Sequence, residues 1–124
     1  KCTGRVTYEQ LYKYVQQADY LLPLLDPNNQ KHERYIKDGT SGTFQLCYGF
    51  LKPMIINENF ATAHGFSKEN AIIYNGNCLP QKMEAAIKQN QKEYRELVNN
   101  IKNKELDIYQ KSLKNIESYI GKIK

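Results

Sequence analysis

Three short apolar runs, each of strand length and each separated from the next by a segment with helical character, constrain the fold most. They occupy residues 20–25, 54–56 and 71–74. The first run is apolar at every position, as expected of a strand whose sheet is covered on both faces. Strands that alternate with helices form a parallel sheet with helices packed on its faces. The sequence therefore predicts an α/β fold with a Rossmann-like parallel sheet of about three strands.

The segment before the first run carries a helix start signal. Thr7 and Gln10 have the spacing of a capping box, and apolar residues then recur with helical spacing from Tyr8 onward. Within the first run, Pro23 cannot donate a ladder hydrogen bond, so we place it near the carboxyl end of the predicted strand.

A second helix is expected between the first two runs. It should begin at Thr40 or Ser41 and end before Pro53, because proline cannot continue a helix. Polar residues 26–39 ahead of it predict a long surface loop. Residues 57–66 predict an irregular connection with one helical turn.

From Pro80 onward the chain contains no further proline and only Gly121 as glycine, which predicts a helical tail over residues 80–124. The five-residue step between Ile101 and Leu106 predicts a break or kink. The last apolar face of this tail has 3,4,3,4 spacing and comprises Leu106, Tyr109, Leu113, Ile116 and Ile120.

Composition and length fit one soluble domain. The chain is 40% hydrophobic and 25% charged, and its longest apolar stretches, residues 20–25 and 47–51, fall far short of the roughly 18–20 residues that cross a bilayer. The first residues have no apolar signal-peptide core, so we expect a cytoplasmic protein.

The basic residues concentrate in the last third of the chain. Residues 79–124 carry ten Lys or Arg against six Asp or Glu, whereas residues 1–78 carry eight against seven. Such a stretch can attract anionic lipid, which allows a peripheral position at the inner membrane face, or nucleic acid. Glu and Lys interleave here as on an ordinary solvated helix, and we favour that interpretation. Nucleic acid is the least favoured partner, because the tail lacks Arg-rich or aromatic readout elements.

The cysteines do not suggest a metal site. Cys2, Cys47 and Cys78 are far apart, and neither His32 nor His64 stands near them with ligand spacing. We interpret all three as free thiols, with Cys47 in the core, and expect neither a metal nor a cofactor.

The most informative segment is residues 38–43, Asp-Gly-Thr-Ser-Gly-Thr, directly before the second predicted helix. Glycines let a ligand approach the backbone, and amides in the first turn of a helix can bind phosphate oxygens. The alternative is that Thr40 or Ser41 is simply an N-cap with no ligand. The local pattern leaves both open.

This loop resembles part of the distal half of the C-terminal domain of GT-B glycosyltransferases, when it is taken together with three other motifs: Tyr8-Glu9-Gln10-Leu11-Tyr12, Ala18-Asp19-Tyr20-Leu21-Leu22-Pro23 and Lys52-Pro53-Met54-Ile55-Ile56. The resemblance covers residues 4–90 and implies that residues 1–124 are a single partial domain. The nucleotide sugar then serves as substrate. It also implies that an N-terminal acceptor domain, which supplies the catalytic base, lies outside this chain.

The resemblance also assigns site residues. It gives the donor diphosphate to Gly42 and Thr43, to which the local pattern adds the hydroxyl groups of Thr40 and Ser41, and base contacts to Arg5 and Val6. It places Asp38 at the opening of the loop, as a candidate ribose or sugar contact. Arg34 is a candidate for the sugar or the diphosphate because its guanidinium is a planar fork of donors, and Gln45 is a substitute candidate for the ribose. One position departs from the family, because Leu46 stands where many members have a glutamate that binds the ribose. The parent protein would transfer a sugar to a glycan or lipid-linked acceptor in polysaccharide biosynthesis. The alternative is a non-catalytic Rossmann-like interaction module with a basic helical tail.

Overall fold

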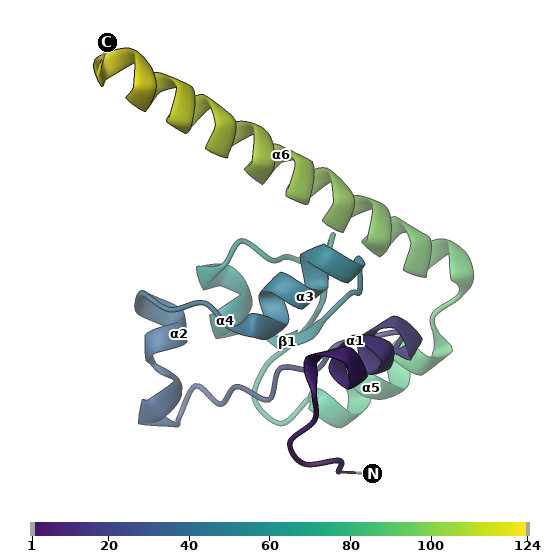
Figure 1. Cartoon of the computed structure of the whole chain (residues 1–124). Helices are drawn as coiled ribbons and strands as arrows, with labels where there is room; N and C mark the ends of the chain where they lie inside the picture. The colour runs from purple at the N-terminus through teal and green to yellow at the C-terminus, as the bar shows by residue number, and fades with distance from the viewer. Residues whose placement is uncertain (1, 124) are drawn as a thin grey trace.

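The computed structural model describes residues 2–123 as an α/β domain with a long helix that leaves it (Figure 1). The elements, in chain order, are α1 (Tyr8–Gln17), η1 (Gln30–His32), α2 (Arg34–Lys37), α3 (Gly42–Phe50), β1 (Ile55–Asn57), α4 (Glu58–Ala63), β2 (Ile72–Tyr74), α5 (Leu79–Lys88) and α6 (Gln91–Ile123).

The sheet is parallel, as predicted, but within residues 2–123 it has two strands and not three. β1 pairs with β2 in the register Ile55 to Ile72, and residues 20–25 contribute one isolated parallel bridge between Leu21 and Met54. The ladder stops there because Pro23 has no N–H to donate. Beyond it the Leu25 amide donates back to the Pro23 carbonyl oxygen at 2.9 Å, which turns the chain away from β1.

The two predicted helix starts are confirmed. At α1, the Thr7 side chain accepts from the Gln10 amide and the Gln10 side chain accepts from the Thr7 amide, which completes the capping box. At α3, the Ser41 hydroxyl accepts from the Thr43 amide at 3.3 Å. α3 ends at Phe50, and the next residue, Leu51, has a left-handed φ of 53° two residues before Pro53.

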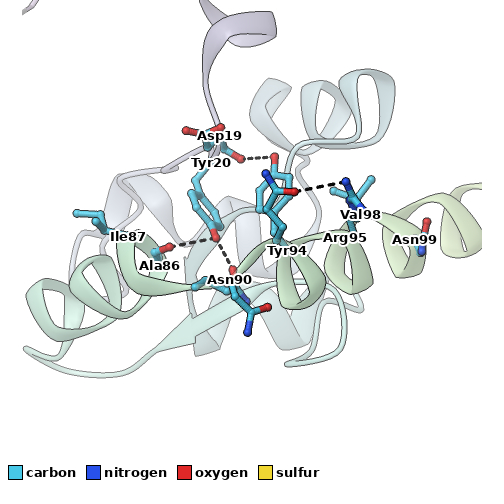
Figure 2. Close-up of a pocket in the computed structure, with 11 residues that line it drawn as sticks. Asp19, Tyr20, Ala86, Ile87, Asn90, Tyr94, Arg95, Val98 and Asn99 are labelled. Carbon is cyan, nitrogen blue, oxygen red and sulfur yellow. Dashed lines mark hydrogen bonds between the residues drawn. The ribbon is translucent and has the colours of Figure 1, made fainter.

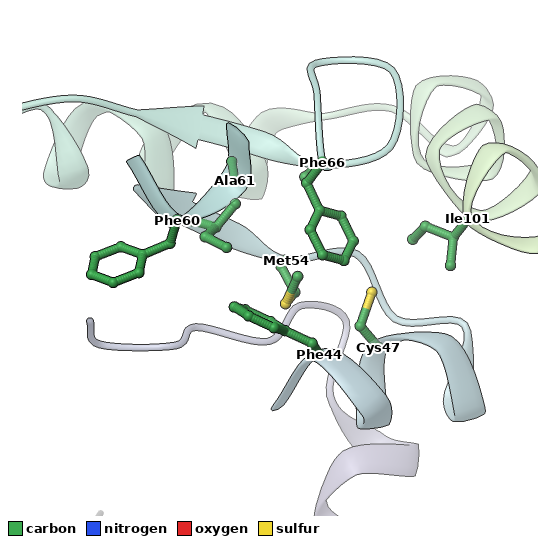
Figure 3. Close-up of a cluster of buried hydrophobic side chains, with 9 residues drawn as sticks. Phe44, Cys47, Met54, Phe60, Ala61, Phe66 and Ile101 are labelled. Atoms are coloured by element: carbon green, nitrogen blue, oxygen red, sulfur yellow. The ribbon is translucent and has the colours of Figure 1, made fainter. Parts of the chain in front are cut away.

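The main core lies between α3, α4, the sheet and α6 (Figure 3). Cys47 is fully buried there, as predicted, and Ile101 from α6 reaches the same cluster. Its largest members with no more than 5% of their surface exposed are Phe44, Met54, Ile56, Phe60, Phe66 and Ile101.

Two connections are more ordered than the sequence predicts. The surface loop 26–39 contains η1 and α2, and the connection 57–66 contains α4. Asn57 explains the second case, because its side chain accepts from the Asn59 amide at 3.0 Å and so caps α4 directly at the end of β1.

The predicted break between Ile101 and Leu106 is wrong, because α6 is continuous from Gln91 to Ile123. The break lies earlier, at Gln89 and Asn90. Asn90 caps the start of α6 through two hydrogen bonds with Glu93. The Asn90 side chain accepts from the Glu93 amide at 2.9 Å, and the Asn90 amide donates to the Glu93 carboxylate at 3.1 Å.

α6 packs on the domain only through its first part. Leu97 and Ile101 are its buried residues, and Figure 1 shows the C-terminal half projecting past the rest of the molecule. At 1.5 Å per residue the helix is about 50 Å long. None of the helices in residues 2–123 combines the length and the apolarity needed to cross a membrane.

Candidate functional site

A cleft of about 640 Å³ lies at the carboxyl edge of the sheet. Its walls come from three segments that each follow a parallel element: residues 24–28 after the Leu21 bridge, Asn57 and Asn59 at the end of β1, and residues 74–80 after β2. Ligands of open parallel sheets bind beyond the carboxyl ends of the strands. This cleft therefore occupies the position that the fold class uses for binding.

Local hydrogen bonds set the shape of two of these walls. Asp26 accepts from the Asn28 amide at 2.9 Å, and the Asp26 amide donates to Nδ1 of His32 at 2.9 Å. On the opposite wall Gly76 has φ 45°, a left-handed conformation that suits glycine, and Pro80 lies in the first turn of α5.

The floor of the cleft is polar at the strand ends. Asn57 is 4% exposed and Tyr74 is 7% exposed. Burial and, secondarily, the negative charge of Asp26 raise the pKa of the Tyr74 hydroxyl, which therefore stays protonated at neutral pH. Hydroxyl, amide and carboxylate groups of this kind bind the hydroxyl groups of sugars or a ribose.

The predicted diphosphate residues lie at the start of α3, outside the residues that line this cleft. α3 leads from the loop at the carboxyl edge back to the start of β1, so its N-terminus is at the same edge of the sheet. Gly42 is exposed, and a Cβ atom added to it would meet nothing within 4 Å.

Three successive amides at this helix start have no acceptor within residues 2–123. The amides of Thr40, Ser41 and Gly42 make no hydrogen bond there, whereas the Thr43 amide is capped by Ser41. Ser41 is thus an N-cap, the alternative that the sequence left open. Capping uses one donor, the Thr43 amide, and leaves the amides of residues 40–42 without an acceptor in the described part of the chain.

The predicted ribose and sugar contacts are exposed. Arg34 begins α2, where its guanidinium donates to the Tyr35 hydroxyl at 2.7 Å and lies 4.7 Å from the centre of the Tyr35 ring. Asp38 directly follows α2, and Gln45 lies on the exposed side of α3. The backbone at Gly39, just after α2, lies close to that of Arg34: a Cβ atom added to Gly39 would be 3.1 Å from the Arg34 carbonyl oxygen.

The predicted base contacts lie ahead of α1. Arg5 is exposed and Val6 is half-buried, in a segment with no regular secondary structure. His64 directly follows α4; its Nε2 contacts the Tyr35 carbonyl oxygen and its ring centre lies 4.5 Å from that of Phe44.

A second cleft of about 670 Å³ lies between α5, α6 and residues Asp19 and Tyr20 (Figure 2). Its polar groups bind one another: the Tyr20 hydroxyl donates to the Ala86 carbonyl oxygen at 3.3 Å and also contacts the Gln89 side chain. Burial, followed by the charge of neighbouring groups, raises the pKa of Tyr20. These contacts fix Tyr20 to the end of α5 and use the polar groups of this cleft internally, so we favour the first cleft as the binding site.

The three cysteines are free thiols, as predicted, with Cys47 buried and Cys2 and Cys78 exposed. Residues 2–123 contain no group of three or more His, Cys, Asp or Glu side chains placed to hold a metal ion.

Reasoning from the sequence missed the cleft residues Asp26, Asn57 and Tyr74. A signal for them existed, because each lies at or just after the carboxyl end of an apolar run, where a parallel sheet places its ligand. Comparison of the chain with protein-family models, curated proteins and solved structures finds no match in any of the three.

Proposed function

We propose that this chain is the donor-binding part of a GT-B type glycosyltransferase, in which the start of α3 holds the diphosphate of a nucleotide sugar. The observation that carries the proposal is the run of three backbone amides, residues 40–42, that have no acceptor within residues 2–123 at the exposed N-terminus of a nine-residue helix. Amides at a helix start, together with the helix dipole, form a favourable site for a doubly charged anion.

The open space at Gly42 supports the same assignment. A diphosphate bound by main-chain amides must approach the backbone closely, and Gly42 presents no side chain in the way. The hydroxyl groups of Thr40 and Ser41 add donors beside these amides. Arg34 and Asp38 belong to the turn that precedes them and are candidates for contacts to the sugar.

The cleft at the carboxyl edge supplies the place for the uncharged part of the donor. Asp26, Asn57 and Tyr74 carry acceptors and a protonated hydroxyl that suit ribose or sugar hydroxyl groups. Leu46 replaces the family's ribose-binding glutamate, so these cleft residues, with Gln45, are candidates for that task. Arg5 and Val6 remain proposed contacts for the base.

In this proposal the chain stabilises the departing diphosphate, while the acceptor hydroxyl and its base belong to an upstream domain. Stabilising the leaving group is an electrostatic contribution to glycosyl transfer, whereas deprotonating the acceptor needs a separate group. A Rossmann-like donor half without its acceptor domain would bind a nucleotide but would not turn over.

A specific substitution pair tests the proposal by calorimetry with uridine diphosphate and guanosine diphosphate. Gly42→Asp adds a carboxylate where the diphosphate would lie, and Gly42→Asn adds a side chain of similar size without charge. An acidic residue in the first turn suits the helix dipole, so Gly42→Asp should remain folded. We expect it to weaken binding at least about tenfold relative to Gly42→Asn. Equal affinity in the two variants would reject the site.

The second candidate is a non-catalytic interaction module that keeps the fold. Two observations favour it: Leu46 at the ribose position and an exposed stripe of apolar side chains on the outer half of α6. Absence of any binding to either nucleotide by the unaltered chain would favour this candidate.

A further inference from the structure

The outer half of α6 carries an exposed apolar stripe. Its six members follow one another at steps of 3, 4, 3, 4 and 3 residues, the spacing of the contact positions in a coiled coil. We refer to them as the α6 seam: Leu106, Tyr109, Leu113, Ile116, Ile120 and Ile123, which are between 40% and 67% exposed.

The domain of the same molecule does not cover this seam. Ile101 is the last residue of α6 that is buried against the domain, and Leu106 follows five residues later. At about 100° per residue, five residues turn the helix by about 140°, so Leu106 lies off the side of α6 that carries Ile101, and the seam that starts there is exposed along its length. Figure 1 shows this half of α6 projecting beyond the other elements.

We propose that the α6 seam binds the same seam of a second copy of this chain, with the two helices antiparallel and Leu106 opposite Ile123. In this register each seam residue of one helix faces an apolar seam residue of the other helix. Tyr109 faces Ile120 of the second copy, and Leu113 faces Ile116 of the second copy. About five helical turns of each molecule would be covered.

The side chains that flank the seam select the antiparallel orientation. Ile108 and Tyr119 are apolar, 44% and 67% exposed, and lie on the same flank. In an antiparallel pair, this flank of one helix lies beside the same flank of the second helix, so Ile108 comes beside Tyr119 of the second copy. In a parallel pair it would meet the other, polar flank, which carries Lys114 and Glu117.

Charges are complementary in the same register. Glu105 and Lys122 share the flank of Ile108, and antiparallel pairing brings Glu105 beside Lys122 of the second copy. On the polar flank, Lys114 comes beside Glu117 of the second copy. Because the axis is two-fold, each contact occurs twice. Asp107 already pairs with Lys111 of its own helix at 2.8 Å.

Sedimentation equilibrium of the full chain over a concentration series tests the pairing. We expect the mass to rise from 14.5 kDa toward twice that value, with a dissociation constant on the order of 10–100 µM because the seam is short. Leu113→Glu with Ile116→Glu should leave a monomer. Ile87→Glu, which changes an isoleucine that is 83% exposed on α5, is the matched control and should dimerise like the unaltered chain.

A charge swap tests the register. Glu105→Lys and Lys122→Glu should each weaken dimerisation about five- to tenfold, and the double variant should restore it. Circular dichroism would verify that each variant remains helical. Three outcomes would overturn the proposal: a monomer up to about 500 µM, no effect of the seam substitutions, or a double variant as weak as the single ones. Adsorption of the monomeric chain to anionic vesicles, blocked by the seam substitutions, would also overturn it in favour of a membrane surface.

Discussion

The hydroxyl of Tyr94 donates a hydrogen bond of 2.8 Å to the main-chain carbonyl oxygen of Asp19, and so joins the first turns of α6 to the chain just ahead of the sheet. The Tyr94 ring also meets the ring of Tyr20 edge-on, with centroids 5.5 Å apart. The base of α6 is therefore fixed to the domain by directional contacts, although its outer half projects from it.

Substitution Tyr94→Phe should lower the free energy of unfolding by about 0.5–1.5 kcal/mol. The ring and its edge-on contact remain, and only the bond to the Asp19 carbonyl oxygen is lost. Urea denaturation measures the change. Tyr119→Phe, on the exposed outer half of α6, is the control and should leave stability unchanged. Equal stabilities for the Tyr94 variant and the unaltered protein would show that the bond contributes nothing.

Substitution Ile101→Ala should destabilise the chain by about 2–4 kcal/mol, because Ile101 is fully buried in the core and its removal leaves a cavity. Ile87→Ala, at a position 83% exposed, should change stability by less than about 0.5 kcal/mol. Thermal and urea unfolding of both variants at low concentration would compare them. A small loss at Ile101 would mean that α6 is not packed on the domain as described.

Substitution Asn57→Ala should cost about 1 kcal/mol, since it removes the cap of α4 at a buried position. Asn57→Asp keeps an acceptor for the Asn59 amide and should recover most of the loss. Urea denaturation of the two variants provides the measurement. A loss that is the same for Ala and Asp would contradict the capping role.

Stability should fall at alkaline pH because burial raises the pKa of the Cys47 thiol to about 12 and that of the Tyr48 hydroxyl to about 12. The unfolded chain loses these protons near pH 9 and 10, whereas the folded chain keeps them, so ionisation favours unfolding between pH 9 and 12. Urea denaturation from pH 7 to pH 11 measures the decline, and Cys47→Ala should reduce its slope. A flat profile would contradict the burial of both groups.

The local signals of this chain predicted helix starts well and strand extent poorly. Thr7 with Gln10 and Ser41 before Gly42 act through bonds within a few residues, and both formed as the sequence indicated. Whether residues 20–25 extend a sheet depends on a partner strand and on where the chain turns. Pro23 ends the ladder after a single bridge, so an apolar strand-like run contributes one pair instead of a strand.

The helical tail shows why a shift in apolar spacing is not by itself a break. The step from Ile101 to Leu106 marks the point where α6 stops facing the domain, and the backbone continues. The true break at Asn90 had a local signal, an Asn followed three residues later by Glu93, which the sequence analysis passed over.

One part of the candidate site could be predicted from a local sequence pattern and the other part could not. The exposed start of α3 could be predicted because glycines and hydroxyl residues ahead of a helix are a local pattern. The cleft was missed although Asp26, Asn57 and Tyr74 each lie at the end of an apolar run, because they come together only when three separate segments end at one edge of the sheet.

The most direct test of the account is an NMR titration of the unaltered chain with uridine diphosphate and guanosine diphosphate, followed at the backbone amides of α3. We predict saturating shifts at Ser41 and Gly42, and little change at Gly49 near the other end of the same helix. Unchanged Ser41 and Gly42 resonances up to about 5 mM of both nucleotides would contradict the claim that this helix start binds a diphosphate.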